Sequence, residues 1–140
     1  MRIGFASDHA GFELKERLKA WAQANGHQVL DYGTDGLASV DYPDFAHRAA
    51  EKLHEWERLV LVCGSGIGIS IAANRHVGVR CALVTSPEHA ALARQHNDAN
   101  AIAFGQRLTD PLMAESYLKI FLETPFEGGR HQKRVEKIEI

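Results

Sequence analysis

The chain has 140 residues, of which 45% are hydrophobic and 24% are charged, a composition typical of one soluble domain over residues 1–140. The net charge of -2 gives no overall basic field, so the charge balance does not indicate nucleic-acid binding. No apolar run approaches the roughly 18 residues that a membrane span needs, and residues 1–5 are typical of a first strand rather than of a signal peptide.

Short apolar segments alternate with amphipathic segments along the chain. The run 59–63 is continuously apolar, as expected of a central strand in a parallel sheet. In the segment 11–25, Leu14 and Leu18 belong to an apolar stripe, and Lys15 is expected on the opposite, polar face. The same patterns predict five strands, over residues 2–6, 27–31, 59–63, 80–84 and 101–104. They predict helices over residues 11–25, 44–55, 69–74, 86–95 and from residue 110 onwards, followed by a basic tail over residues 125–140.

Five strands that alternate with helices predict an α/β fold. We expect a three-layer αβα sandwich with a five-stranded, parallel, Rossmann-like sheet and a C-terminal helical tail. In such folds, ligands bind outside the carboxyl ends of the strands. The segments just past the predicted strands are residues 7–9, 32–34, 64–66, 85–86 and 105–107, and three of them carry polar or charged groups able to do chemistry.

Three glycines alternate in the loop that follows the strand 59–63. Gly64, Gly66 and Gly68 would let backbone N–H groups converge on an anion, and the N-terminus of the next helix adds a favourable dipole. The loop lacks the Gly-Lys-Ser/Thr of a P-loop, and Ile69 stands where the last glycine of a dinucleotide-binding loop would be. It could hold a phosphate, stabilise an oxyanion that develops during a reaction, or make a tight turn without a ligand.

Cys63 ends the central strand directly before this loop. A helix N-terminus favours the thiolate form of a cysteine, so Cys63 could serve as a base or a nucleophile. It could equally be an inert, buried small hydrophobe, which is what we expect of Cys81 inside its strand. The two cysteines form no disulfide framework, which favours reduced thiols in a cytoplasmic protein.

Two polar turns add further candidate groups. Asp8 and His9 follow the first strand and together could position a hydroxyl and move a proton, although Asp8 could also cap a helix. His96 and Asn97 follow a helix, where a histidine is often only a partner of the helix dipole. A general acid–base role for His96 requires that its ring face the strand-end crevice. No pair of histidines has the spacing of a metal site such as HExxH, so no metal is predicted.

The tail carries a group of basic residues. If it is helical, Arg130 and Arg134 lie one turn apart on the same face, and such a pair suits bidentate recognition of phosphate. The alternative is a solvated basic tail. A tail that extends outward cannot easily fold over its own crevice, so it would instead reach a partner subunit.

Together these segments resemble the ribose-5-phosphate isomerase B family, which includes related allose- and galactose-6-phosphate isomerases. The resemblance spans nearly the whole chain and rests on the ordered set of motifs rather than on any one of them. The matching segments are Ser-Asp-His-Ala-Gly-Phe at 7–12, Asp-Tyr-Pro-Asp at 41–44, Cys-Gly-Ser-Gly-Ile-Gly-Ile-Ser-Ile-Ala-Ala-Asn at 63–74, Arg-Gln-His-Asn-Asp at 94–98, Ala-Phe-Gly-Gln-Arg at 103–107 and Glu-Gly-Gly-Arg-His-Gln-Lys-Arg-Val at 127–135.

The resemblance implies an aldose–ketose isomerase that interconverts D-ribose 5-phosphate and D-ribulose 5-phosphate, a reaction of the pentose phosphate pathway, with no metal and no organic cofactor. Cys63 would be the base that moves a proton between C1 and C2, because the glutamate that other members use instead would stand at Ile69. His96 would be the acid that opens the furanose ring, with Ser65 and Asp8 assisting at hydroxyls.

The resemblance also implies the substrate contacts and the assembly. Backbone N–H groups of the loop would hold the enediolate oxyanion, and arginines would bind the phosphate, some of them from the other subunit of a homodimer or of a dimer of dimers. The loop residues are Gly64, Ser65, Gly66, Ile67 and Gly68; the sugar contacts are Asp8, His9 and Asn97, with Tyr42 lining the pocket; the phosphate contacts are Arg107, Arg130 and Arg134.

Three alternatives stay open at the level of sequence. The same chemistry could act on a six-carbon sugar phosphate such as allose 6-phosphate or galactose 6-phosphate. The chain could be a non-catalytic module that senses a nucleotide or a phosphate, although the missing dinucleotide pattern counts against this. It could also be a cysteine hydrolase, which would need a Cys63–His96 pair and a separate acid that orients the histidine.

Overall fold

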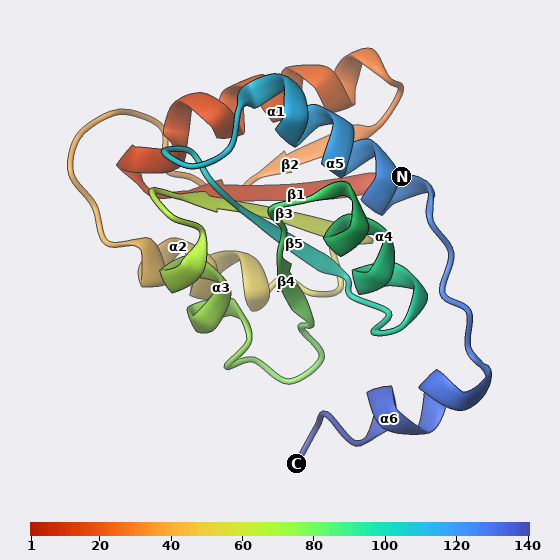
Figure 1. Cartoon of the computed structure of the whole chain (residues 1–140). Helices are drawn as coiled ribbons and strands as arrows, with labels where there is room; N and C mark the ends of the chain where they lie inside the picture. The colour runs from red at the N-terminus through yellow and green to blue at the C-terminus, as the bar shows by residue number, and fades with distance from the viewer.

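The computed structural model describes residues 1–140 and contains one five-stranded sheet with helices on both faces (Figure 1). All neighbouring strands are parallel, in the order β2-β1-β3-β5-β4. The strands are β1 (Arg2–Ser7), β2 (Gln28–Asp31), β3 (Arg58–Cys63), β4 (Cys81–Leu83) and β5 (Ala101–Gly105). The predicted αβα sandwich is therefore confirmed, and every predicted strand end lies within one residue of the observed end.

Six α-helices and two short 3₁₀ turns connect and follow the strands. They are η1 (His9–Gly11), α1 (Phe12–Ala24), α2 (Tyr42–Ala50), α3 (Ile67–Ala73), α4 (Pro87–Gln95), α5 (Pro111–Glu123), η2 (Gly129–His131) and α6 (Gln132–Glu136). None of these helices is long and apolar enough to cross a membrane.

The central strand β3 shows how the three layers form. Successive side chains of a strand point to opposite faces of the sheet. Val60 and Val62 belong to the core that the sheet shares with α1, α4 and α5, whereas Leu59, Leu61 and Cys63 belong to the core shared with α2 and α3. Both faces of the strand are buried, which explains why its sequence is continuously apolar.

Two helices begin earlier than their sequence patterns predicted. The helix α2 begins at Tyr42 rather than at residue 44, because Pro43 lies in the first turn, where no backbone N–H is needed, and it ends at Ala50 rather than at residue 55. The helix α3 begins at Ile67 rather than at residue 69, directly after Gly66, whose φ of 77° is in the left-handed region. The loop after β3 is therefore shorter than predicted, and its last residues form the first helical turn.

The strand order places two sets of polar turns at opposite edges of the sheet. The order reverses between β1 and β3, so a crevice is expected where the carboxyl ends of these strands meet. Register pairs Ser7 with Val62 and Cys63 with Gly105, so the turns that follow β1, β3 and β5 share this carboxyl edge. The turn that follows α4 precedes β5 and lies at the opposite, amino edge.

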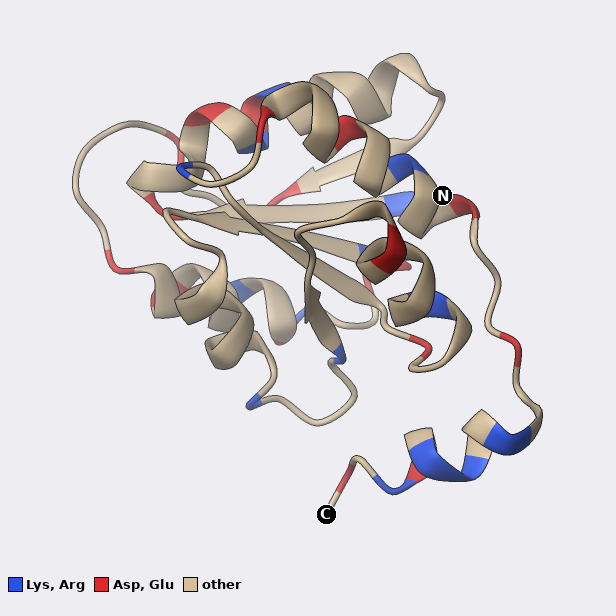
Figure 2. Cartoon of the chain, viewed as in Figure 1, with Lys and Arg blue, Asp and Glu red and all other residues tan.

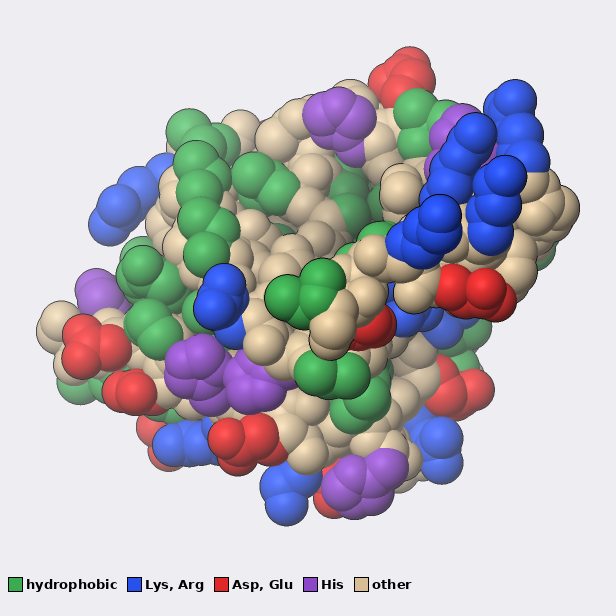
Figure 3. Space-filling view, turned by 90° about the horizontal axis from the view of Figure 1, so that it is seen from below, with side chains coloured by type: hydrophobic (Ala, Val, Ile, Leu, Met, Phe, Trp, Pro, Cys, Tyr) green, Lys and Arg blue, Asp and Glu red, His purple; other side chains and the backbone are tan.

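The C-terminal tail runs along the outside of the αβα body (Figure 1), with the side chains of His131 and Val135 buried. Two hydrogen bonds tie it back: the Glu127 N–H donates to the Gln95 carbonyl at 3.1 Å, and the Gly78 N–H donates to Glu139 Oε1 at 2.8 Å. The helix α6 and the turn before it are rich in Lys and Arg (Figure 2), and basic side chains gather at one corner of the face seen in Figure 3. The predicted basic helical tail is thus present, although its helix has only one to two turns.

Candidate active site

Cys63 lies at the mouth of the glycine loop, at the carboxyl end of β3. Its side chain is 4% exposed, and its Sγ accepts a hydrogen bond from the Gly66 N–H at 3.2 Å. The Cys63 carbonyl accepts a second bond from the Gln106 N–H at 2.9 Å, which joins the loop to the turn after β5. The sulfur is therefore held in one place, directly beside the backbone N–H groups of the loop.

Several backbone N–H groups of the loop have no hydrogen-bond partner within the chain. The Gly66 N–H is used by Cys63 Sγ, and the Ile67 N–H donates to Ser65 Oγ at 3.2 Å. The N–H groups of Gly64, Ser65 and Gly68 make no such bond. Unpaired donors at the start of a helix are suited to an anion, so the loop can bind negative charge next to the thiol.

Two of the predicted binding residues pack against the glycines of this loop. A Cβ added at Gly64 would come within 2.8 Å of Arg107 Nη1, and one added at Gly68 would come within 2.5 Å of the Tyr42 ring. The Arg107 guanidinium and the Tyr42 ring therefore flank the loop. A larger residue at Gly68 would clash with the Tyr42 ring, which can move less easily than the flexible end of Arg107 beside Gly64.

The Asp8–His9 turn follows β1 and borders the crevice at the carboxyl ends of β1 and β3. Asp8 is buried and accepts a hydrogen bond from the Gly11 N–H at 3.0 Å, as expected of a helix cap. His9 Nδ1 accepts a bond from the Val40 N–H at 3.1 Å. Because Nδ1 is an acceptor here, the neutral ring carries its hydrogen on Nε2, which can donate to a ligand.

His96 and Asn97 do not face this crevice. They follow α4 and precede β5, whose Ala101 pairs with Leu59 at the start of β3, whereas Gly105 pairs with Cys63. Four strand residues, roughly 13 Å, separate the two pairs. His96 therefore cannot reach the crevice of its own chain, because the turn follows a helix and not a strand.

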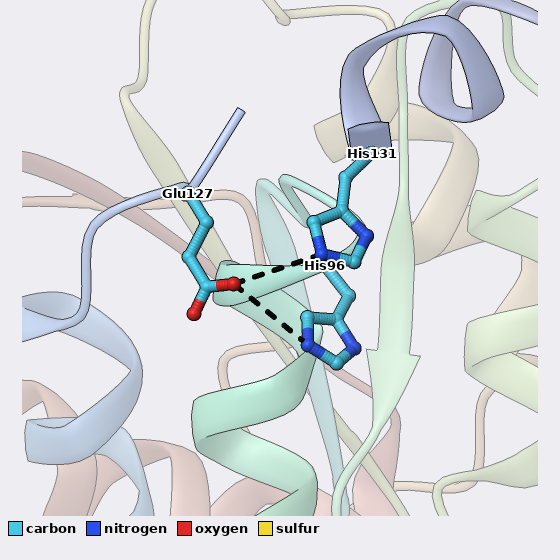
Figure 4. A group of neighbouring side chains, drawn as sticks. All are labelled: His96, Glu127 and His131. Carbon is cyan, nitrogen blue, oxygen red and sulfur yellow. Dashed lines mark ion pairs between the residues drawn. The ribbon is translucent and has the colours of Figure 1, made fainter. Parts of the chain in front are cut away.

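The tail arginines are also absent from the carboxyl edge of their own chain. Arg130 and Arg134 are exposed on η2 and α6, beyond the amino edge of the sheet. Beside them, His131 stacks on His96 with 4.2 Å between ring centroids, and both face the Glu127 carboxylate (Figure 4). The predicted site residues thus form two groups, one at each edge of the sheet.

A model of the ribose/galactose isomerase family matches residues 3–138. The chain belongs to the ribose/galactose isomerase family. Ribose-5-phosphate isomerase B of Escherichia coli (strain K12) is 42% identical over 139 residues, which cover 98% of this chain and 93% of that protein.

Solved structures of the family agree with the fold. A ribose 5-phosphate isomerase from Thermotoga maritima is 46% identical with a TM-score of 0.96 and covers 99% of this chain and 97% of its own. Ribose-5-phosphate isomerase B from Mycoplasma genitalium, solved with bound ribulose 5-phosphate, is 40% identical with a TM-score of 0.93, over 98% of this chain and 93% of its own.

The Asp8–His9 turn is supported by Lys15, whose burial the helical pattern did not predict. Lys15 is fully buried rather than on a polar face, and its Nζ donates to Asp31 Oδ1 at 2.8 Å and to the Thr34 carbonyl. Burial opposes the ionisation of Asp31, but hydrogen bonds from Lys15 and Lys19 lower its pKa below the ordinary value. The Thr34 N–H in turn donates to the Ser7 carbonyl at 2.8 Å, directly before Asp8. The ion pair between the buried Lys15 and the partly exposed Asp31 therefore fixes the segment on which the Asp8–His9 turn rests.

Glu127 and His131 are further residues to which the sequence assigned no role. Both lie in the segment 127–135, but helical spacing gave no reason to bring them to His96. They meet His96 because the tail passes beside the end of α4, where the Glu127 N–H donates to the Gln95 carbonyl.

Proposed function

We propose that this chain interconverts D-ribose 5-phosphate and D-ribulose 5-phosphate, the aldose–ketose isomerisation of the pentose phosphate pathway. The observation that carries the proposal is the position of Cys63: its sulfur lies beside unpaired N–H groups at the switch point of the sheet. The bound ribulose 5-phosphate of the Mycoplasma genitalium relative supports the five-carbon substrate over a six-carbon one.

Cys63 acts as the carbon base in this proposal. In the open-chain aldose, the Cys63 thiolate takes the proton from C2, and the electron pair forms the C1–C2 double bond while O1 becomes anionic. The N–H groups of Gly64, Ser65 and Gly68 stabilise that oxyanion. Transfer of a proton from O2 to O1, followed by return of the carbon proton to C1, gives the ketose and regenerates the thiolate.

The remaining groups bind and open the sugar. Asp8 and His9 hold its hydroxyls, with Ser65 and Asp8 assisting proton movement and Tyr42 lining the pocket beside the loop. Arg107 binds the phosphate from the same chain. A fixed phosphate positions the reacting carbons several atoms away, which supplies part of the catalysis as orientation.

The site is completed by a second copy of the chain. His96, Asn97, Arg130 and Arg134 lie at the amino edge of the sheet and cannot reach Cys63 of their own chain. A homodimer, or a dimer of dimers, brings the amino edge of one protomer to the carboxyl edge of the next, where His96 opens the furanose ring and the arginines complete the phosphate site. The outward tail supports this arrangement.

One assay tests the proposal. Purified protein is given ribose 5-phosphate or allose 6-phosphate, and Cys63→Ala is measured alongside. We expect turnover of ribose 5-phosphate that exceeds turnover of allose 6-phosphate and is nearly abolished in the variant. Unchanged turnover in Cys63→Ala would remove the proposed base, and preference for allose 6-phosphate would reverse the substrate.

A further inference from the structure

Three metal-binding side chains meet at the amino edge of the sheet (Figure 4). His131 Nε2 lies 3.6 Å from Glu127 Oε1, and His96 Nε2 lies 4.0 Å from the same oxygen. One ligand atom from each residue can be chosen so that all three lie within 4.8 Å of one another. Two imidazole nitrogens and one carboxylate oxygen are a common ligand set for zinc.

The chain builds this cluster with specific local contacts. The Glu127 N–H donates to the Gln95 carbonyl at 3.1 Å, which places the Glu127 side chain beside the end of α4. Gly128 and Gly129 then adopt φ values of 65° and 54°, a left-handed turn that favours glycine. This turn returns the chain so that His131, which is 8% exposed, covers the ring of His96.

The geometry is close to that of an open zinc site. Ligand atoms about 2.0 to 2.1 Å from a tetrahedral zinc ion lie about 3.3 Å from one another. The observed separations exceed this by less than 1 Å for both histidine–glutamate pairs. The Glu127 and His96 side chains are 50% and 39% exposed, so they have room to close, with one ring turning out of the stack. A water molecule would complete the fourth position.

One of the three ligands carries a negative charge, which suits a cation. The Glu127 carboxylate contributes the negative charge that offsets the neighbouring basic residues of the tail.

We propose that His96, Glu127 and His131 form a binding site for zinc or a similar divalent transition metal, and that metal bound there inhibits the isomerase. The inhibitory part rests on the proposed function: a metal on His96 Nε2 prevents this nitrogen from carrying the proton that an acid must donate in ring opening. The binding part stands on the cluster alone, so the two parts can fail separately.

Binding is measured without reference to activity. The metal-free protein is titrated with Co²⁺, whose visible absorption reports tetrahedral nitrogen and oxygen ligands, and then with Zn²⁺ in competition. We expect Glu127→Gln and His131→Ala to bind Zn²⁺ more than about tenfold more weakly than wild type, since loss of even an outer-shell group commonly costs 10- to 100-fold. The exposed His54→Ala is the matched control and should bind as wild type does.

Glu127→Gln keeps the proposal testable if His131→Ala loosens the tail, because Glu127 is half exposed and its backbone contact with Gln95 is retained. Equal Zn²⁺ affinity in wild type and Glu127→Gln would overturn the site. Loss of Zn²⁺ binding in Cys63→Ser would also overturn it, because the metal would then be on the thiol.

Inhibition is measured as the zinc concentration that halves turnover, each variant being compared with its own zinc-free rate. We expect chelator-reversible inhibition in wild type and His54→Ala, and a shift of more than about tenfold to higher zinc in Glu127→Gln. Tight binding at the cluster without inhibition would overturn the inhibitory part. If the protein isomerises neither sugar, the proposed function fails, and the Co²⁺ titration still decides the metal site.

Discussion

The two edges of the sheet are built in different ways. At the carboxyl edge, Cys63 and Asp8 are buried, and backbone hydrogen bonds hold the turns around them. At the amino edge, His96 is 39% exposed, and Arg130 and Arg134 extend into solvent from a tail with few ties to the body. In the proposed mechanism, the carboxyl edge supplies the carbon base and the oxyanion site, and the amino edge supplies the acid that opens the sugar ring. The difference supports the proposal that each chain contributes two unlike half-sites.

The largest effect is expected from the buried thiol of the carboxyl edge. Cys63→Ser keeps the size of the side chain but replaces a good base by a very poor one, so kcat should fall about 100- to 10,000-fold while KM changes little. Steady-state kinetics with ribose 5-phosphate measure both constants.

Cys81→Ser is the matched control for this substitution. Desolvation raises the pKa of the Cys81 thiol to about 12, so this cysteine stays protonated and takes no part in proton transfer. Its variant should retain turnover within a few-fold of wild type. A larger loss in Cys81→Ser than in Cys63→Ser would show that the reaction centre has been assigned to the wrong strand.

The second-largest expected effect tests whether the carboxyl edge of one protomer and the amino edge of its partner form one active site. Arg134→Ala protomers and Cys63→Ala protomers are each expected to be nearly inactive alone. In a mixed dimer, one of the two shared sites contains both natural residues, so random mixing should restore about a quarter of the wild-type rate. Turnover is measured on verified mixtures of the two purified variants. If no activity returns although mixed dimers have formed, each site is built from a single chain.

The carboxyl edge was the more predictable of the two. Its turns directly follow apolar strands, and the rule that ligands bind past the carboxyl ends of parallel strands places Asp8, the Cys63 loop and Arg107 together from sequence alone. The same rule gives no place in this crevice to His96, because its turn follows α4 and precedes β5 and so lies at the amino edge.

Other features depend on tertiary contacts that no local pattern contains. The helical period put Lys15 on a polar face, but it is buried, with Asp31 at the end of β2 and Thr34 in the following loop as its partners. His96 meets Glu127 and His131 because Gly128 and Gly129 adopt positive φ values. Glycine adopts positive and negative φ about equally well, so the sequence alone does not predict this turn.

The third effect concerns the support beneath the Asp8–His9 turn. Lys15→Met fills the same volume but leaves Asp31 and the Thr34 carbonyl without their buried donor, so the free energy of unfolding should fall by about 3 kcal/mol. Urea denaturation at fixed protein concentration measures the change. The exposed Lys52→Met serves as a control and should change stability by less than about 0.5 kcal/mol. Equal stability of the two variants would mean that the buried pair does not hold the carboxyl edge together.

The smallest expected effect is a pH dependence of the free energy of unfolding, caused by Asp31, the partner of Lys15. Because the pKa of Asp31 is lower in the folded chain than in the unfolded chain, its ionisation stabilises the fold fully above about pH 4, and this contribution is lost as the pH falls through the folded value. Asp31→Asn should therefore be less stable than wild type at pH 6, by about 1 kcal/mol, and the difference should shrink at pH 3. Glu115→Gln, which removes the carboxylate of an ion pair with the half-exposed Arg17, should show a smaller difference at pH 6. A difference for Asp31→Asn that stays constant between pH 6 and pH 3 would mean that the charge of Asp31 does not contribute, since Asn keeps its size and shape. The loss would then come from the hydrogen bonds that the second carboxylate oxygen accepts.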